Sequence, residues 1–333
     1  METIQLAIQN NLILAWVVIV IAFAALAKCA DLFVDTSVGI ADRLKVPKLV
    51  IGIVLVSLAT TAPELSVSLM SALRGQPEMA LGNAIGSVIC DDGLALGLAG
   101  LLTIAPIMVM PNVLKTSGFF LLLVEILAFV FVAFDRSLER AEGAMLVGLF
   151  AAYLFFLYRQ HKQGKFKDGL DAVEAAAGEK KSTLRLSLFF IIALAGIILA
   201  SEFIITSATA IARSFGIPEA VIALTLVAFG TSIPEVATCI VAARKKEGAI
   251  AVGNILGADI MNICWVAGAS SIANDLVLSK KQIFFMFPAM FVIVGAMLLM
   301  LRMGYDLTRK KGIILLGLYF VYLASFFRLF PPQ

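Results

Sequence analysis

Charge is the feature that this chain has least of. Asp, Glu, Lys and Arg make up only 15% of its 333 residues, whereas they make up about a quarter of an ordinary soluble domain. Hydrophobic residues make up 61%, the mean hydropathy is +1.00, and the apolar residues gather in long uncharged runs. A run of about 18 apolar residues can cross a bilayer as a helix, and barrel strands are shorter than these runs. The composition therefore predicts an all-α membrane protein.

Histidine and cysteine, which supply many active sites and metal sites, are also scarce. The one histidine, His161, falls in a short basic segment, and the chain shows no nucleophile–base motif or cofactor fingerprint. The cysteines, Cys29, Cys90, Cys239 and Cys264, lie inside apolar runs without metal-ligand spacing. We expect them to pack as small hydrophobic side chains. Neither an enzyme nor a bound cofactor is expected.

Ten membrane spans are predicted from the apolar runs. They cover roughly residues 12–34, 48–73, 79–101, 116–134, 142–159, 186–208, 218–243, 249–272, 282–301 and 312–329. The polar stretch between the fifth and sixth spans is too short for a folded domain and is predicted to be a linker. We therefore expect a first five-span half over 1–159, a linker over 160–185 and a second five-span half over 186–333.

The basic residues favour one orientation in the membrane. Of the 26 Lys and Arg residues, 18 belong to connections on one side of the ten spans and 7 to the other side. Basic connections remain in the cytoplasm, so the linker is expected to be cytoplasmic and both termini outside, in a prokaryotic inner membrane. The net charge of +3 then reflects topology and contact with the lipid bilayer, and nucleic acid is not an expected partner.

An internal repeat relates the two halves. Residues 47–90 align without a gap to residues 218–261 at a constant offset of 171 positions, and 14 of the 44 pairs are identical. Shared apolar composition does not explain the Thr, Pro-Glu and Gly-Asn identities. Because five spans is an odd number, the second half must enter the membrane upside down relative to the first. This is the inverted-topology repeat of many secondary transporters.

Each copy of the repeat carries a hydroxyl pair followed by Pro-Glu in the middle of a span. The two copies read Thr60, Thr61, Ala62, Pro63, Glu64 and Thr231, Ser232, Ile233, Pro234, Glu235. A helix-interior proline removes one backbone hydrogen bond and exposes a carbonyl. A carboxylate near the bilayer centre needs a cation, a partner or a proton. Hydroxyl, carbonyl and carboxylate oxygens together suit hard cations such as Na⁺ and Ca²⁺.

A second motif follows in the next span of each half. It starts as Gly82-Asn83 in the first copy and Gly253-Asn254 in the second, with another glycine four residues after the first. Glycines at this spacing allow close helix packing. Packing does not explain the polar residues at positions 83, 87 and 91, which lie on one helix face and should point into the bundle or a cavity.

These two segments resemble the alpha-repeats of the calcium/cation antiporter superfamily, here over 47–101 and 218–272. The length of the chain resembles the compact prokaryotic sodium/calcium exchangers of that superfamily. The resemblance implies ten helices and a central site between the second and third spans of each half. It also implies exchange of Ca²⁺ for Na⁺ by alternating access, with inorganic cations as the transported partners. The oligomeric state stays open.

The resemblance also implies a set of cation ligands. Carried over position by position, they are the backbone carbonyls of Ser57 and Ala228 and the side chains of Thr60, Thr61, Glu64, Ser87, Asp91, Thr231, Ser232, Glu235 and Asn262.

The chain departs from the usual pattern of the superfamily in three respects. Ala258 stands where a hydroxyl is usual, and the acid of the Asp/Asn pair is in the first half, as Asp91, with the amide Asn262 in the second. Asp92 and Asp259 are additional acids for which the superfamily suggests no role. A proton-coupled cation antiporter, with these aspartates as proton carriers, is therefore an alternative. A cation channel and a non-transporting membrane component are further alternatives.

Overall fold

The computed structural model describes residues 2–163, 182–216 and 229–330. Up to the linker these form α1 (Glu2–Gln9), α2 (Leu12–Leu44), α3 (Lys48–Ile51), the π-helical η1 (Gly52–Val56), α4 (Ser57–Thr60), α5 (Ala62–Leu73), α6 (Pro77–Cys90), the π-helical η2 (Asp91–Ala95), α7 (Leu96–Leu102), β1 (Ile107–Met108), α8 (Pro111–Asp135), β2 (Ser137–Leu138) and α9 (Arg140–Lys162).

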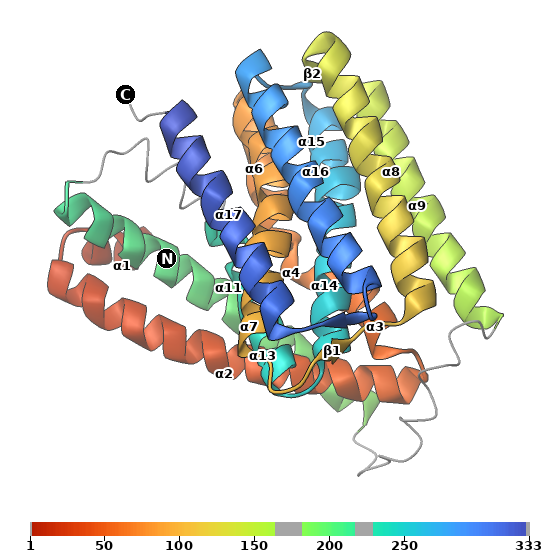
Figure 1. The fold of residues 1–333 in the computed structure, drawn as a ribbon. Helices are drawn as coiled ribbons and strands as arrows, with labels where there is room; N and C mark the ends of the chain where they lie inside the picture. The colour runs from red at the N-terminus through yellow and green to blue at the C-terminus, as the bar shows by residue number, and fades with distance from the viewer. Residues whose placement is uncertain (1, 164–181, 217–228, 331–333) are drawn as a thin grey trace.

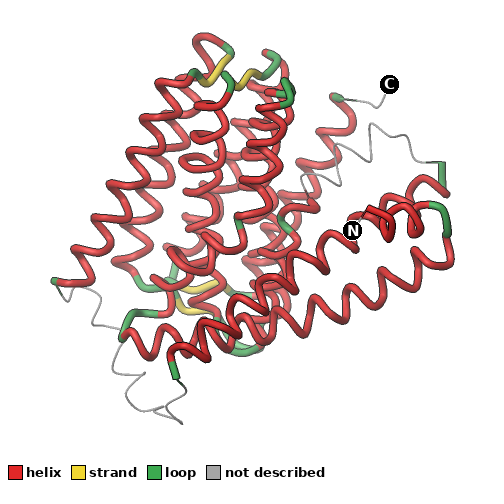
Figure 2. Tube along the Cα trace, turned by 180° about the vertical axis from the view of Figure 1, so that it is seen from behind, coloured by secondary structure: helices red, strands yellow, loops and turns green. Residues whose placement is uncertain are grey.

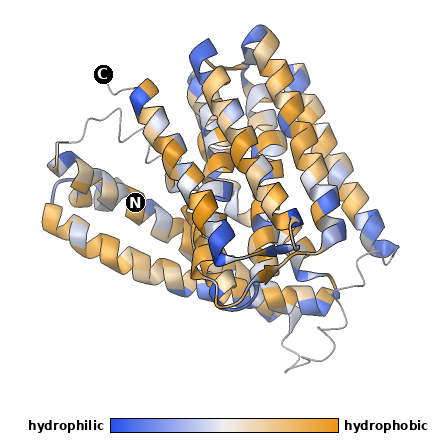
Figure 3. Ribbon diagram, viewed as in Figure 1, coloured by the Kyte–Doolittle hydropathy of each residue, from blue (hydrophilic) through white to orange (hydrophobic). Residues whose placement is uncertain are grey.

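The rest of the described chain continues the same helical architecture. Its elements are α11 (Thr183–Ser214), α13 (Ile233–Arg244), α14 (Gly248–Met261), the π-helical η4 (Asn262–Ala267), α15 (Gly268–Ala273), β3 (Leu276–Val277), α16 (Lys280–Arg302), β4 (Asp306–Leu307) and α17 (Arg309–Leu329). Hydrophobic residues predominate along these helices (Figure 3), and many large apolar side chains are exposed on them, as lipid contact requires. The prediction of an all-α membrane protein is confirmed.

Nine of the ten predicted spans correspond to helices that are long and apolar enough to cross a membrane. Eight are single candidate spans, and the ninth is the pair Gly52–Thr60 and Ala62–Leu73, bent by 51° at its break. The remaining predicted span, 218–243, begins with residues that lie outside the described chain. Only the second part of this span is described, and most of it forms α13. Ten spans therefore stays a prediction.

Two helices are much longer than predicted. The expected spans 12–34 and 186–208 are parts of α2 and α11, which have 33 and 32 residues. At 1.5 Å per residue each is about 50 Å long, so a bilayer core of about 30 Å holds them only at a slant. Figures 1 and 2 show the pair running obliquely beside the upright bundle, and Phe33 packs on Phe190 with ring centroids 4.6 Å apart.

The short strands define the two faces of the bundle. β1 pairs antiparallel with β4, and β2 pairs antiparallel with β3, at opposite ends of the upright helices (Figure 1). On the first face, Lys48 forms an ion pair with Glu247. On the second face, Asn274 donates a 3.0 Å hydrogen bond to the Ala72 carbonyl at the end of α5. We call these the Lys245 face and the Arg74 face, after the residues that follow α13 and α5.

Each half of the chain contributes one strand to each pair. The offset of 171 residues relates β1 to the neighbourhood of β3, and β2 to that of β4. The two strand pairs on opposite faces are thus counterparts of one another. This reciprocity is what a two-fold axis in the membrane plane produces.

Local signals explain where several helices begin and end. Pro77 opens α6, a first-turn position that needs no backbone donor. Ser279 and Gln282 form a capping box at the start of α16. Gly75, with φ of 74°, turns the chain between α5 and α6, and a residue with a Cβ atom would be strained there.

Glycines allow α14 to lie directly against η1 and α4. A Cβ atom on Gly52 would lie 2.7 Å from the Ile250 carbonyl oxygen and 2.9 Å from the Asn254 nitrogen, and one on Gly257 would collide with the Ile53 carbonyl and the Ser57 hydroxyl. The expected packing role is therefore confirmed for Gly257. Gly82 differs, because nothing lies within 4 Å of a Cβ added there.

We predict that Gly52→Ala destabilises the protein, since backbone atoms of α14 cannot move aside as a side chain can. Overpacking of a well-packed contact costs about 1–3 kcal/mol, so the unfolding temperature of the detergent-solubilised protein should fall. Gly148→Ala in α9 is the matched control, because its added methyl group meets nothing within 4 Å. Equal unfolding temperatures for the two variants would contradict close packing at Gly52.

Candidate cation-binding site

The Pro-Glu motifs form two breaks in the bundle core. Thr61 ends α4 with φ and ψ of −79° and 1°, and α5 begins at the next residue with its proline in the first turn. Ser232 has almost the same conformation, −82° and 3°, directly before α13. The same local sequence therefore produces the same interruption in both halves.

The two glutamates occupy equivalent places just after these breaks. Glu64 lies in the first turn of α5 and Glu235 in the first turn of α13, and both are fully buried. Backbone N–H groups at a helix N-terminus carry partial positive charge, which stabilises a nearby carboxylate. The breaks thus create two helix N-termini inside the membrane, each beside a carboxylate.

Each glutamate faces hydroxyl groups of the other half. The Ser232 hydroxyl donates to Glu64 Oε1 at 3.4 Å, a long hydrogen bond. The Glu235 carboxylate lies next to the hydroxyls of Thr60 and Thr61, although neither of its oxygens accepts a hydrogen bond of good geometry. The structure therefore brings five of the predicted ligands together across the interface between the halves.

Two asparagines also belong to this constellation, although the sequence analysis does not include them among the ligands. The Thr60 hydroxyl donates to Asn254 Oδ1 at 3.1 Å, and the Thr231 hydroxyl donates to Asn83 Oδ1 at 3.3 Å. These bonds connect opposite halves reciprocally. The signal for them was present in the sequence, because both asparagines are identical positions of the repeat.

A relay on the preceding helix orients each asparagine. Asn83 Nδ2 donates to the Ser68 hydroxyl at 3.0 Å, and Ser68 donates to the Ala80 carbonyl at 3.1 Å. Cys239 is the counterpart of Ser68, with its sulfur 4.0 Å from Asn254 Nδ2 and 3.6 Å from the Ala251 carbonyl. Cys239 therefore has a polar role beyond the hydrophobic packing expected for it.

The acid–amide pair meets across the same interface. Asn262 Nδ2 donates to Asp91 Oδ2 at 3.4 Å, and these two residues are 171 positions apart. Each opens a π-helical segment, η2 or η4. Such segments widen a helix by one residue and are frequent at functional sites. The sequence predicts both residues, whereas the π-helical geometry is visible only in the structure.

Many oxygens of this site lack a donor. Buried atoms without a hydrogen-bond partner include Thr61 Oγ1, Glu64 Oε2, Ser87 Oγ, Asp91 Oδ1, Asn262 Oδ1 and both carboxylate oxygens of Glu235. No basic side chain in the described ranges forms an ion pair with the three acids. Buried charges without such compensation are costly. An inorganic cation would satisfy these oxygens, and their chemistry fits Na⁺ or Ca²⁺.

The donor set is mixed in its chemistry. Over residues 2–163, 182–216 and 229–330, no three carboxylate, histidine or cysteine side chains converge as the ligands of one metal ion. In this conformation, carboxylates alone therefore do not form a complete set of ligands for one cation. Hydroxyl and amide oxygens from both halves would have to complete the coordination.

The remaining predicted ligands differ in how the structure places them. The Ser57 carbonyl accepts hydrogen bonds from the Thr61 backbone at 2.9 Å and from the Thr60 hydroxyl at 3.4 Å. Ser87 is buried in α6 one turn before Asp91. Ala228 lies outside the described residues. Ligand roles for these three positions stay predictions.

A second group of acids lies beside the site. Asp92, Asp259 and Glu125 of α8 are fully buried, and none of their carboxyl oxygens has a donor. The Asp92 and Asp259 carboxyls are close to each other, and Glu125 is near both. Glu125 is not among the residues predicted from the sequence, although a lone acid within an apolar span indicates a buried polar function.

A cavity of about 950 Å³ approaches the site from the Arg74 face. Its described wall includes Gln76 and Glu78 near the Arg74 face and Gly82, Asn83 and Cys90 further along α6. Aromatic residues of α17 line the opposite wall. Asn83 is thus the member of the hydrogen-bonded constellation that this cavity reaches.

We predict that Ser68→Ala weakens the site through Asn83. A buried amide without its acceptor costs about 1–3 kcal/mol, so thermal stability and Ca²⁺ binding should both decrease. Ser68→Cys should retain both properties, because cysteine occupies the equivalent position of the other half. Ser66→Ala is the matched control, since that exposed hydroxyl bonds only to its own helix, at the Ala62 carbonyl. Equal binding by Ser68→Ala and Ser66→Ala would contradict the relay.

The chain is similar to a known protein family and to individual proteins over almost its whole length. The family model described as sodium/calcium exchanger protein matches residues 14–159 and 186–328. Sodium/calcium exchanger MaX1 of Methanosarcina acetivorans is 30% identical over 352 aligned positions, which cover 94% of this chain and 98% of that protein. Inner membrane protein YrbG of Escherichia coli is 32% identical over 324 positions, covering 96% and 99%.

A solved structure matches almost the whole fold. The sodium-calcium exchanger NCX_Mj, soaked with Na⁺ and Sr²⁺, superposes with a TM-score of 0.79 at 29% sequence identity. The match covers 95% of this chain and 99% of that one. By its family match, its relatives and its fold, this chain belongs to the sodium/calcium exchanger family, within the calcium/cation antiporter superfamily.

Proposed function

We propose that this cation antiporter exchanges Ca²⁺ for Na⁺ by alternating access at the site between the two breaks. The family supports cation antiport, and the name of its relative MaX1, a sodium/calcium exchanger, supports this pair of ions. The observation that carries the proposal is the group of buried carboxylate, hydroxyl and amide oxygens without donors. Hard cations are the ions that such oxygens bind in proteins.

The proposed ligands come from both halves of the chain. Glu64, Thr60, Thr61 and Asp91 act from the first half, and Glu235, Thr231, Ser232 and Asn262 act from the second. Ser87 and the backbone carbonyls at Ser57 and Ala228 complete the proposed set. We assign Asn83 and Asn254 a positioning role, because each accepts a hydrogen bond from a threonine of the site.

The architecture proposed for transport is a pair of inverted five-span repeats, over 1–159 and 186–333. The reciprocal threonine–asparagine bonds and the paired strands on opposite faces support this symmetry. An inverted pair provides two access states, because the two halves can exchange conformations about a fixed central site. Ten spans complete this arrangement.

We also propose an orientation in the cell. The Lys245 face carries most of the basic connections, so it is cytoplasmic by the positive-inside rule. The termini and the cavity mouth are then outside, in a prokaryotic inner membrane. The name of YrbG, an inner membrane protein, supports that location.

The experiment that tests the function is ion flux in proteoliposomes with the gradients of Na⁺, H⁺ and Ca²⁺ set independently. An outward Na⁺ gradient should drive Ca²⁺ uptake at constant pH. Uptake driven only by a proton gradient would overturn Na⁺ as the counter-ion. A channel would be identified by Ca²⁺ flux that needs no Na⁺ or H⁺ gradient and that moves neither Na⁺ nor H⁺ in the opposite direction.

We predict that Glu64→Gln and Glu235→Gln each abolish Ca²⁺ uptake, because each removes a site carboxylate while preserving side-chain volume. Flux should fall to that of empty liposomes, and size-exclusion chromatography should still show folded protein. Glu78→Gln, at an exposed position in α6, is the control and should transport normally. Wild-type flux in either site variant would place the ion elsewhere.

A second prediction concerns the reversed acid–amide pair. Asp91→Asn alone should reduce exchange strongly, because one of three site carboxylates is lost. Adding Asn262→Asp restores the charge on the other side of the contact, so the double variant should transport substantially more than the single one. Normal flux in Asp91→Asn would show that Asp91 is not needed for transport. A double variant as inactive as the single one would show that the position of the acid matters.

A further inference from the structure

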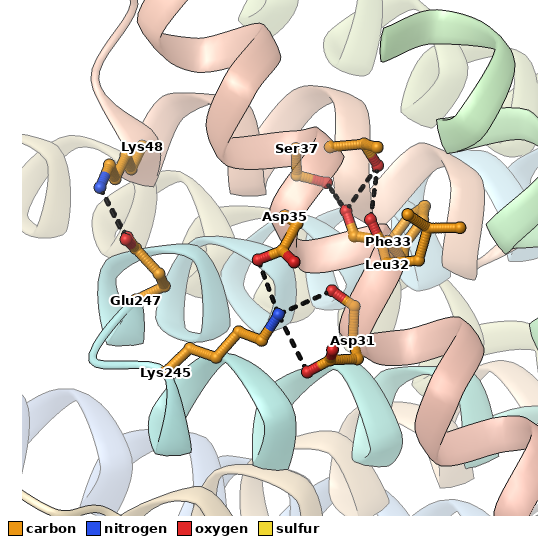
Figure 4. Close-up of polar contacts among 9 residues, drawn as sticks. Asp31, Leu32, Phe33, Asp35, Ser37, Lys48, Lys245 and Glu247 are labelled. Atoms are coloured by element: carbon orange, nitrogen blue, oxygen red, sulfur yellow. Dashed lines mark hydrogen bonds and ion pairs between the residues drawn. The ribbon is translucent and has the colours of Figure 1, made fainter. Parts of the chain in front are cut away.

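The two faces of the molecule differ in their ion pairs. Lys245, directly after α13, lies 2.6 Å from an Asp35 carboxylate oxygen and 2.9 Å from one of Asp31 (Figure 4). Both aspartates belong to α2. Beside them, Lys48 of α3 lies 2.7 Å from Glu247. On the Lys245 face, these contacts connect the first half of the chain to the turn between α13 and α14.

The repeat places a matching charge pair on the opposite face. The offset of 171 residues relates Lys245 to Arg74, and it relates Asp31 to Glu202. Charge sign is preserved at both positions. Arg74 follows α5 just as Lys245 follows α13, and Glu202 lies in α11 as Asp31 lies in α2.

These counterparts do not meet in this conformation. Arg74 and Glu202 are exposed, and neither forms an ion pair within the described chain. The helices next to these charged residues show the same difference in packing. α13 packs along α2, whereas its counterpart α5, which is described completely, makes no comparable contact with α11, the counterpart of α2.

We propose that Lys245–Asp31/Asp35 and Arg74–Glu202 are alternative ion pairs, each formed in one of the two access states. The inference rests on the inverted repeat and the alternating access proposed above. In the conformation described, the α2–α11 pair is held to α13 on the Lys245 face, and the cavity approaches the site from the Arg74 face. In the other conformation, Arg74 reaches Glu202 and α5 packs on α11.

The strength of the observed contact suits a reversible latch. The Lys245 side chain is 24% exposed and that of Asp35 is 60% exposed, so water competes for both. Partial burial acts to lower the pKa of Lys245, but its hydrogen bonds to Asp35 and Asp31 outweigh that effect and raise the pKa. Exposed pairs shift an equilibrium by only about two- to five-fold. Such a pair biases a state without locking it.

The test measures how readily the cavity admits a reagent. Gly82→Cys is a suitable reporter, because Gly82 lines the cavity and a Cβ atom there meets nothing within 4 Å. Cys90, which also lines the cavity, is replaced by alanine in every protein compared. The rate of reaction with an uncharged polar maleimide then reports the population that is open on the Arg74 face.

Lys245→Gln should slow this reaction by about two- to five-fold, because it removes a pair present only in the open state. Arg74→Gln acts on the other state, so alone it should not slow labelling, and in the Lys245→Gln background it should restore the rate. Lys246→Gln and Arg328→Gln are matched controls that remove the same charge, because neither residue forms an ion pair within the described residues, and they should leave the rate unchanged.

Three labelling results would overturn the latch. In the first, Arg74→Gln slows labelling as much as Lys245→Gln does. In the second, Lys246→Gln slows labelling as much as Lys245→Gln, and in the third, the double variant labels as slowly as Lys245→Gln alone. A cross-link supplies an independent measurement. Arg74→Cys with Glu202→Cys should be joined by a short bis-methanethiosulfonate cross-linker, which forms a disulfide with each thiol and should stop exchange until those disulfides are reduced. Absence of this cross-link under every ionic condition would also overturn the proposal.

Labelling and cross-linking do not require knowledge of the transported ions. If labelling shifts as expected while Glu64→Gln transports normally, the latch stands and the proposed ligands fail. If Glu64→Gln is inactive while the labelling rates of all variants agree, the ligands stand and the latch fails. The two proposals can therefore be distinguished in one set of proteins.

Discussion

Burial of carboxylates without basic partners is the constraint on which the rest of this structure depends. Glu64, Glu235 and Asp91 are fully inside an apolar bundle, where an uncompensated charge is costly. The two helix breaks direct helix N-termini and hydroxyl groups toward the glutamates. In the proposed function, a transported cation supplies the compensation that these dipoles leave incomplete. Carboxylates that were fully compensated by the protein itself would bind a cation only weakly.

The halves complement each other at the level of single hydrogen bonds. Thr60 reaches Asn254, and Thr231 reaches Asn83, so neither half orders its own threonine alone. Departures from exact equivalence are equally informative. Ser68 corresponds to Cys239, and Asp91 corresponds to Asn262. A strictly duplicated chain would place two acids at the Asp91–Asn262 contact, where their like charges would repel each other.

Rigid and exchangeable contacts are found in different parts of the molecule. At the core, Gly52 and Gly257 bring backbone against backbone, and such packing resists gradual deformation. At the Lys245 face, the contacts between α13 and α2 include ion pairs of partly exposed side chains. Exposed ion pairs contribute about 0–1 kcal/mol. This division suits a transporter, because the ligands must keep their geometry while the surrounding helices exchange partners.

The sequence was sufficient to predict the class of protein, nine of the span positions that the structure describes, and the motifs that meet at the site. These follow from local properties: apolar run length, the effect of proline on a helix, and the cost of an acid in lipid. Span lengths were less predictable. The polar C-terminal part of α2, with Asp35, Asp42 and Arg43, resembles a loop when composition alone is considered.

Which residues meet across the halves depends on the tertiary fold and could not be predicted from the sequence. The Asn83 and Asn254 contacts, the proximity of Glu125 to the other acids, and the Lys245 ion pairs join residues that are distant in the chain. Periodicity assigns a residue to a face of its own helix, but it does not say which helix lies opposite. That choice depends on the packing of all the helices together, because each interface is determined by the shapes of both surfaces.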